Sequence, residues 1–291
     1  MSQNRLHLIC HPSWMRDELA ANTKYEVEHS FGLDVPEFQK KDIWWLPQAQ
    51  AVQLLNSIQA HQITPVPAFT APSGGLLAQL DKLFVGRATG LLAAHEAVSV
   101  LVEWPTQFWK LATAKSDKFE AKVRTHEELI SDIEAAELPA ESLLEYSEVL
   151  DGAKRIIKEY RLYVSDGEIQ TGSLYLDFSD ASNPVTIYDG AVSDTEELAA
   201  AIEFGETVVT APHAPDMPPA YVMDVALLDN GDWIVLEFNP VWCSAWYDAD
   251  VDAVVATIAR GFMVSASEKK KWAYQPDPLL LNKYKQIWPK K

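Results

Sequence analysis

The sequence predicts a protein of the α+β class, in which an N-terminal α/β unit is followed by a domain of antiparallel sheets. In the first hundred residues, short apolar runs typical of strands alternate with helical patterns. After Pro105, strand-like runs follow one another as hairpins and are separated by single helices. The dipeptide Asn230–Gly231, between two apolar runs, is the strongest of these hairpin signals. We therefore expect a change of architecture near residue 103.

The N-terminal unit contains three helical patterns and two strand candidates. In chain order they are a strand at 6–10, a helix from Trp14, a helix at 48–61, a strand at 65–69 and a helical stretch from 76 to about 102. The last of these follows turn residues and is expected to be interrupted near Gly86 and Gly90. Such alternation indicates a small parallel sheet.

The second part of the chain carries most of the strand signals. The expected strands lie at 107–112, 118–124, 142–149, 157–165, 168–176, 220–228 and 233–239, and the expected helices at 126–136, 194–204 and 249–262. We therefore divide the sequence into an α/β unit over 1–103, an α+β domain over 104–265 and a basic C-terminal tail over 266–291.

The charge balance limits the possible partners. The chain has a formal charge of −18, from 42 acidic and 24 basic residues, and such a chain repels a nucleic-acid backbone unless its positive charge is clustered. The clearest cluster is in the tail, at Lys269, Lys270, Lys271, Lys283, Lys285, Lys290 and Lys291. We interpret this tail as solvated rather than as a nucleic-acid arm. A nucleic-acid partner is therefore not expected, whereas a small anionic ligand stays possible.

Cysteine usage and hydropathy indicate the compartment. Cys10 and Cys243 are the only cysteines and belong to no metal-ligand motif, which argues against a disulfide scaffold or a structural zinc site. The sequence has no signal-peptide pattern and no run of about 18 apolar residues. We expect a cytoplasmic protein without a membrane span, and its oligomeric state stays open.

The Asn-Gly hairpin places three polar side chains on one sheet face. With a two-residue turn, Asp224 lies opposite Glu237, and Val222 lies opposite Asn239. The other face is wholly apolar and is expected to join the core; its pairs are Leu227 with Ile234, Val225 with Leu236 and Met223 with Phe238. The hairpin therefore presents two carboxylates and an amide together.

Two carboxylates in direct cross-strand register, about 5 Å apart at Cβ, repel each other. A divalent cation removes this conflict, and Mg²⁺ is typically held by one or two carboxylates together with substrate phosphates. An exposed polar face, or a carboxylate with a raised pKa, explains the same pattern. The hairpin alone leaves these interpretations open.

The sequence from 221 to 240, YVMDVALLDNGDWIVLEFNP, resembles the closing hairpin of ATP-grasp enzymes. The run EFNPVWCSAWY, from Glu237 to Tyr247, is similar to a segment of compact ATP-grasp proteins of bacteria and phages. The resemblance spans about residues 105–262 and implies a two-lobed ATP-grasp domain behind a pre-ATP-grasp α/β unit. It also implies that Asp224, Glu237 and Asn239 bind Mg²⁺ ions that bridge the phosphates of ATP.

Upstream segments resemble the family in the order that it requires. On this resemblance Lys110 and Lys118 reach the nucleotide phosphates, and the backbone of Glu148, Val149 and Leu150 lines the adenine. Glu159 and Arg161 match an E-x-R segment, in which Arg161 neutralises phosphate or acyl-phosphate charge. Arg161 and Lys118 are thereby implied as catalytic residues. One departure is the loop at 112–117, which has no glycine, whereas many ATP-grasp enzymes close a glycine-rich flap over the phosphates.

The resemblance implies a carboxylate–amine ligase that uses Mg–ATP, releases ADP and joins a small-molecule or peptide carboxylate to an amine through an acyl-phosphate. The alternatives are a nucleotide-binding regulatory protein of the same fold, or an ATP-dependent enzyme that modifies RNA or a peptide. P-loop and Rossmann motifs are absent from the sequence. A thiol enzyme that uses Cys243 with His213 is a weaker possibility. Trp242 and Trp246 could border an acceptor pocket, and Ser244 and Tyr247 could contact substrate.

Overall fold

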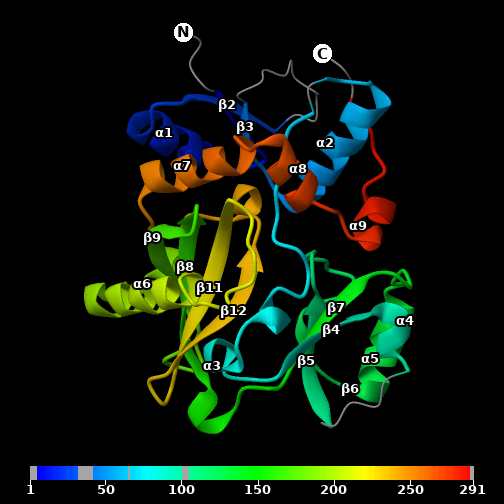
Figure 1. Ribbon diagram of the computed structural model, residues 1–291, viewed down its shortest axis with the longest axis vertical. Coiled ribbons are helices and arrows are strands. Elements are labelled where there is room, and N and C mark those ends of the chain that lie inside the picture. Colours follow the sequence, from blue (N-terminus) through cyan, green and yellow to red (C-terminus); the bar gives the residue numbers. More distant parts are fainter. Residues whose placement is uncertain (1–4, 32–41, 65, 100–104, 289–291) are drawn as a thin grey trace.

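The computed structural model describes residues 5–31, 42–64, 66–99 and 105–288. Its strands form three sheets, with the orders β2-β1-β3, β4-β7-β5-β6 and β10-β9-β8-β11-β12. The three-stranded sheet lies at one end of the molecule, and the two larger sheets form separate lobes below it (Figure 1). The first sheet is parallel and the other two are antiparallel, which confirms the predicted α+β class.

The N-terminal unit is built around the parallel sheet. Its elements are β1 (Arg5–Ile9), α1 (Ser13–Asn22), β2 (Glu26–Ser30), β3 (Ile43–Trp45) and α2 (Gln48–Ala60). The sequence predicted β1 and both helices but neither of the other strands. The segment of β2, EVEHS, is polar and only partly buried, and β3 has three residues, so neither shows the pattern of a strand.

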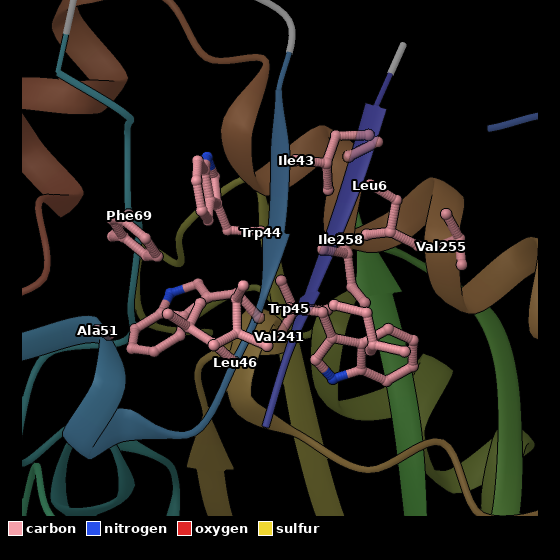
Figure 2. Close-up of a cluster of buried hydrophobic side chains, with 14 of the residues drawn as sticks. Leu6, Ile43, Trp44, Trp45, Leu46, Ala51, Phe69, Val241, Val255 and Ile258 are labelled. Atoms are coloured by element: carbon pink, nitrogen blue, oxygen red, sulfur yellow. The ribbon is translucent and has the colours of Figure 1, made fainter. Parts of the chain in front are cut away.

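Large aromatic side chains fill the core of this unit. Trp44 and Trp45 are fully buried, and the ring of His7 stacks on Trp44 with centroids 4.1 Å apart. Figure 2 shows that Val255 and Ile258 belong to the same cluster. Both come from α7 (Val251–Phe262), so a helix from the C-terminal half of the chain completes the N-terminal core.

The smaller lobe is the four-stranded sheet. Its elements are β4 (Thr89–Ala93), α4 (Ala94–Ala97), β5 (Thr106–Leu111), β6 (Lys122–Thr125), α5 (His126–Ala135) and β7 (Leu143–Ser147). The predicted strand at 118–124 is shorter than expected, because the chain up to residue 121 forms a loop that buries Phe119. α5 begins with a capping box, in which Thr125 accepts from the backbone N–H of Glu128.

The larger lobe is the five-stranded sheet. Its elements are β8 (Ile156–Ser165), β9 (Glu168–Asp177), β10 (Val185–Thr186), α6 (Thr195–Val209), β11 (Ala220–Leu228) and β12 (Trp233–Asn239). α6 covers one face, where its apolar side packs on Leu162, Met223 and Val225. The opposite face is left to line a cleft.

Two predictions for the region before residue 100 are wrong. Residues 66–69 form no strand, and residue 65 lies outside the described residues. The expected long helix is replaced by short α3 (Lys82–Val85), then β4 and α4. Gly86 ends α3 in the left-handed region, with φ +66°, and a Cβ on Gly90 would lie 2.4 Å from the ring of Tyr146. Both glycines serve a strand pairing rather than a kinked helix.

The division of the chain at 103 stays a prediction, and that position lies outside the described residues. The pairing of β4 with β7 places residues that precede it in one sheet with strands that follow it. No helix in the described part of the chain is long and apolar enough to cross a membrane.

The described part of the C-terminal segment is not the solvated tail that we expected. It forms α8 (Ala266–Trp272) and α9 (Pro278–Lys283), and α9 lies beside the smaller lobe (Figure 1). Trp288 is 2% exposed, and its backbone N–H donates to Ser57 Oγ at 2.6 Å. Apolar residues spaced among the lysines bury this segment against the N-terminal unit and the smaller lobe.

Candidate functional site

The largest hollow in the molecule is a cleft of about 1360 Å³ between the two antiparallel lobes. Its walls come from the free face of the five-stranded sheet and from β5 and β7 of the smaller lobe. Residues of the N-terminal unit and of the C-terminal segment, including Gln48 and Tyr274, also line it. Most of the residues that the sequence singled out lie on these walls.

The β11–β12 hairpin brings the predicted polar residues together, although its turn differs from the prediction. Asp224 pairs with Glu237, and Val222 pairs with Asn239, as predicted. The turn, however, is one residue longer, because the backbone N–H of Leu228 donates to Asp232, so Val225 pairs with Val235 rather than Leu236. A β-bulge between Asp224 and Val225 on β11, opposite Leu236, then restores the predicted register.

Asp224 is held by Arg161 inside the larger lobe. Arg161 Nε donates to Asp224 Oδ1 at 2.9 Å, and Nη2 donates to Oδ2 at 2.8 Å. The side chain of Asp224 is 0% exposed and that of Arg161 is 7% exposed. Burial raises the pKa of Asp224, and the guanidinium opposes this shift. Arg161 therefore compensates a buried carboxylate, which the sequence did not indicate.

Two tyrosine rings enclose the same arginine. The guanidinium carbon of Arg161 lies 5.2 Å from the ring centroids of both Tyr175 and Tyr247. These two rings stack on each other with centroids 5.2 Å apart. Tyr247 is thus placed against Arg161, and it is not among the residues that line the cleft.

Glu237 joins the two lobes through Lys110. Lys110 Nζ, from β5, lies 2.7 Å from Glu237 Oε2 and 3.2 Å from Glu145 Oε1 on β7. Burial alone would raise the pKa of Glu237, but Lys110 and Lys115, with a hydrogen bond from Asn239, lower it below its usual range. Burial would likewise lower the pKa of Lys110, and the two glutamates raise it instead.

The donor set fits a divalent cation. Asn239 Nδ2 donates to Asp224 Oδ2 and to Glu237 Oε1, both at 2.8 Å, so two carboxylate oxygens converge on one point. No group of three or more His, Cys, Asp or Glu side chains in the described chain could hold a metal ion by itself. A site here would consist of two carboxylates and the oxygen of Asn239, with the remaining ligands supplied by water or phosphate. This requires the amide of Asn239 to turn its oxygen inward.

The cleft contains some of the other predicted residues and not all of them. Glu148, Val149 and Leu150 line it, and Glu148 Oε2 accepts a hydrogen bond from the backbone N–H of Ala88 at 3.3 Å. Lys118 is exposed and is not among the residues that line the cleft. Lys115, three residues earlier in the same loop, lines it instead.

Sequence reasoning missed Arg87, which is buried at the edge of the cleft. Its Nη1 donates to the carbonyl oxygens of Val85 and Val235 at 3.0 and 3.1 Å, and Nη2 donates to that of Leu236 at 3.2 Å. Burial lowers the pKa of Arg87 to about 10, against the opposing charges of nearby glutamates. Arg87 lies in the region that we expected to be helical, so no spacing argument pointed to the cleft.

The remaining candidates separate clearly. Trp242 is fully buried and donates from Nε1 to the carbonyl oxygen of Thr70, and Trp246 is 5% exposed, so both belong to the core and neither lines the cleft. Cys243 and Ser244 do line it. Burial raises the pKa of Cys243 to about 12, which disfavours a thiolate, and His213 is exposed away from the cleft.

Glu159 is a buried carboxyl on the cleft face of β8. It accepts a hydrogen bond from the hydroxyl of Tyr175. Burial raises its pKa to about 7; the hydrogen bond from Tyr175 opposes this shift, and the charges of Asp224 and Glu237 add to it. Glu159 therefore takes up a proton on folding at mildly acidic pH.

We expect this proton uptake to lower stability as the pH rises. An acid whose folded pKa lies above its unfolded value, here near 4.5, makes the folded state bind more protons between pH 4.5 and 7. Glu159→Gln should keep the hydrogen bond and raise the free energy of unfolding at pH 8 by about 2–3 kcal/mol, with little effect at pH 4.5. Urea unfolding at both pH values checks this, and an equal effect at the two would contradict it.

Fold and site together define a two-lobed protein with a polar cleft between antiparallel sheets. Residues 68–258, about two thirds of the chain, match the model of a family of ATP-grasp domains, which is family 3 of its clade. The chain therefore belongs to this ATP-grasp family, which confirms the resemblance seen in the sequence. No curated protein sequence matches the chain.

Comparison with solved structures gives the same fold. D-cycloserine synthetase DcsG is similar with a TM-score of 0.51 and 14% identity, over 89% of this chain and 98% of that one. Two further ligases are similar at lower scores. The ATP-grasp ligase PsnB, complexed with a minimal precursor, has a TM-score of 0.45 and 14% identity, over 89% and 100%. D-alanine-D-alanine ligase from Coxiella burnetii has a TM-score of 0.43 and 8% identity, over 92% and 97%.

Proposed function

We propose that this protein is an ADP-forming carboxylate–amine ligase that binds Mg–ATP in the cleft between its lobes. The observation that carries the proposal is the convergence of Asp224 Oδ2 and Glu237 Oε1 on the amide of Asn239, 2.8 Å from each. Lys110 reaches the carboxylate of Glu237 from the opposite lobe. An anionic ligand bound between the lobes would therefore meet a fixed cation on one side and a metal-binding pair on the other.

The residues of the cleft suggest how ATP would lie. Leu150, Ile156 and Leu236 form an apolar patch on the cleft wall, which suits the adenine ring. Lys110 and Arg87 would face the phosphates, and Arg87 has its present hydrogen bonds only to carbonyl groups among the described residues. Lys118 stays a prediction of the sequence, whereas Lys115 is the lysine of its loop that lines the cleft.

Asp224, Glu237 and Asn239 would hold Mg²⁺. When bound, the ion neutralises charge on the phosphate oxygens as the terminal phosphoryl group is transferred. Arg161 would act by fixing the carboxylate of Asp224, since both of its bonded nitrogens are committed there. This is a positioning role, and it replaces the direct phosphate contact implied by the resemblance.

The proposed reaction has two steps. A substrate carboxylate attacks the terminal phosphorus of ATP and releases ADP, which gives an acyl-phosphate. An amine then attacks the acyl carbon, and inorganic phosphate leaves with the bonding electrons. The enzyme must gather two anions and shield them from water, so fixed cations and a closed cleft supply most of the catalysis. We propose a cytoplasmic location and a small-molecule or peptide carboxylate and amine as substrates.

The alternatives are tested by chemistry rather than by binding. A regulatory ATP-grasp protein would bind Mg–ATP without releasing ADP when amino acids or peptides are added. An RNA-modifying enzyme would need free positive charge, yet Lys269 donates to the carbonyl oxygen of Val66 and Lys283 pairs with Asp117. We therefore keep the ligase as the proposal.

Replacing Glu237 and Asn239 together with alanine is expected to weaken Mg²⁺-dependent binding of AMP-PNP at least tenfold, or roughly 1.4 kcal/mol. Binding should be measured by titration calorimetry with and without Mg²⁺, because only the metal-dependent part should fall. Glu206→Ala, on the exposed side of α6, is the control. Intact Mg²⁺-dependent binding in the double variant would show that these residues do not form the site.

A further inference from the structure

The loop that joins β5 to β6 covers one end of the cleft without any glycine. Thr113, Lys115 and Ser116 from this loop line the cleft. Glycines give many phosphate-covering loops their freedom to fold down, and here that freedom is missing. Something else must therefore set the position of this loop.

Gln48, the first residue of α2, binds the loop at two points. Its Nε2 donates to the carbonyl oxygen of Thr113 at 2.7 Å, and its Oε1 accepts from the backbone N–H of Lys115 at 3.2 Å. The side-chain amide thus contacts residues two apart in the loop, as a neighbouring β-strand would. The helix start is fixed by Pro47, with φ −60°, so the N-terminal unit holds the loop from a rigid element.

A second anchor comes from the C-terminal segment. Lys283 Nζ, in α9, lies 2.5 Å from Asp117 Oδ1 at the end of the same loop. The apolar face of α9 is buried in the smaller lobe through Leu279, and Ser142 Oγ donates to Asp277 at its N-cap at 2.8 Å. The loop is therefore fixed at both ends by elements outside its own lobe.

Between these anchors, Lys115 extends toward the proposed metal ligands. Its Nζ lies 3.8 Å from Glu237 Oε1, and its side chain is 78% exposed. An ion pair this long and exposed contributes little, so its ammonium is free to exchange Glu237 for a phosphate. The backbone of Lys115 is held by Gln48, while its charge remains available.

We propose that Gln48 and Lys283 are positioning residues that hold the β5–β6 loop in place, so that Lys115 binds the terminal phosphate of ATP. This inference rests on the proposed binding of Mg–ATP in the cleft. It gives the N-terminal unit and the C-terminal segment a part in the site. A loop that is ordered before binding loses less conformational freedom when the nucleotide arrives.

The test compares a ligand that carries a terminal phosphate with one that lacks it. Affinities of Mg–AMP-PNP and Mg–ADP are measured by calorimetry for the wild type, Gln48→Ala and Lys115→Met. We expect each variant to bind Mg–AMP-PNP about tenfold more weakly and Mg–ADP with unchanged affinity. The double variant should lose little more than either single one, because both act through one contact.

Gln59→Ala is the matched control, since Gln59 is an exposed glutamine on the same helix. Lys283→Ala tests the second anchor and should shift the ratio of the two affinities in the same direction. Equal losses for both nucleotides, or no loss for Lys115→Met, would overturn the inference and leave the proposed function intact. A wild-type protein that binds neither nucleotide would instead contradict the proposed function.

Discussion

Arg161→Met is expected to lower the free energy of unfolding by about 3–5 kcal/mol, because it leaves the buried carboxylate of Asp224 without its counterion. Asp224 is 0% exposed and accepts two hydrogen bonds from Arg161. Without the guanidinium, the folded protein must protonate Asp224, which costs about 4 kcal/mol at pH 7 relative to an ordinary aspartate. Urea unfolding followed by tryptophan fluorescence measures the loss.

The same argument predicts how the loss depends on pH and on a second substitution. Protonation of Asp224 in the unfolded state removes the penalty, so the difference from the wild type should shrink as the pH falls toward 4. Arg161→Met combined with Asp224→Leu should recover most of the stability, since the buried pair is replaced by apolar groups. Arg16→Met, which breaks an exposed pair with Asp17, is the control. A double variant no more stable than Arg161→Met would refute this account.

The closing hairpin shows how a prediction can be right through compensating differences. The apolar alternation on both strands required Asp224 and Glu237 to share a face, and the Asn-Gly dipeptide located the turn. Neither feature specifies a three-residue loop or the bulge opposite Leu236. Arg87 binds the carbonyl oxygens of Val235 and Leu236 at this bulge, so a residue distant in the sequence helps to fix the register.

The residues that the sequence could not reveal depend on tertiary contacts. Lys115 and Lys118 lie in one polar loop, and only the anchoring of that loop decides which of them lines the cleft. β4 could not be recognised from its own segment, TGLLA, because its strand character comes from pairing with β7. In contrast, the two longest hairpin partners, β8 and β9, have enough alternation to be predicted nearly in full.

Lys110→Met is expected to reduce kcat/KM for ATP-dependent turnover by about 10²–10³-fold, as for the loss of a fixed charge that stabilises a transferring phosphoryl group. Lys110 is the cation that joins Glu237 of the larger lobe to Glu145 of the smaller lobe. Its removal leaves two carboxylates facing each other across the cleft without compensation. Turnover is measured as ADP release with a panel of amino acids and peptides, and Lys122→Met, on β6, is the matched control.

The stability of this variant should also depend on pH in a defined direction. In the wild type Lys110 lowers the pKa of Glu237, so this carboxylate contributes stability above its unfolded pKa and loses it as the pH falls. Without Lys110, burial and the neighbouring carboxylates are expected to raise the pKa of Glu237 instead, so that its ionisation opposes folding. The gap in urea midpoint between wild type and variant should therefore widen as the pH rises from about 4 to 7. A gap that stays constant over this range would mean that Lys110 contributes packing alone, and that the two lobes are not joined by charge.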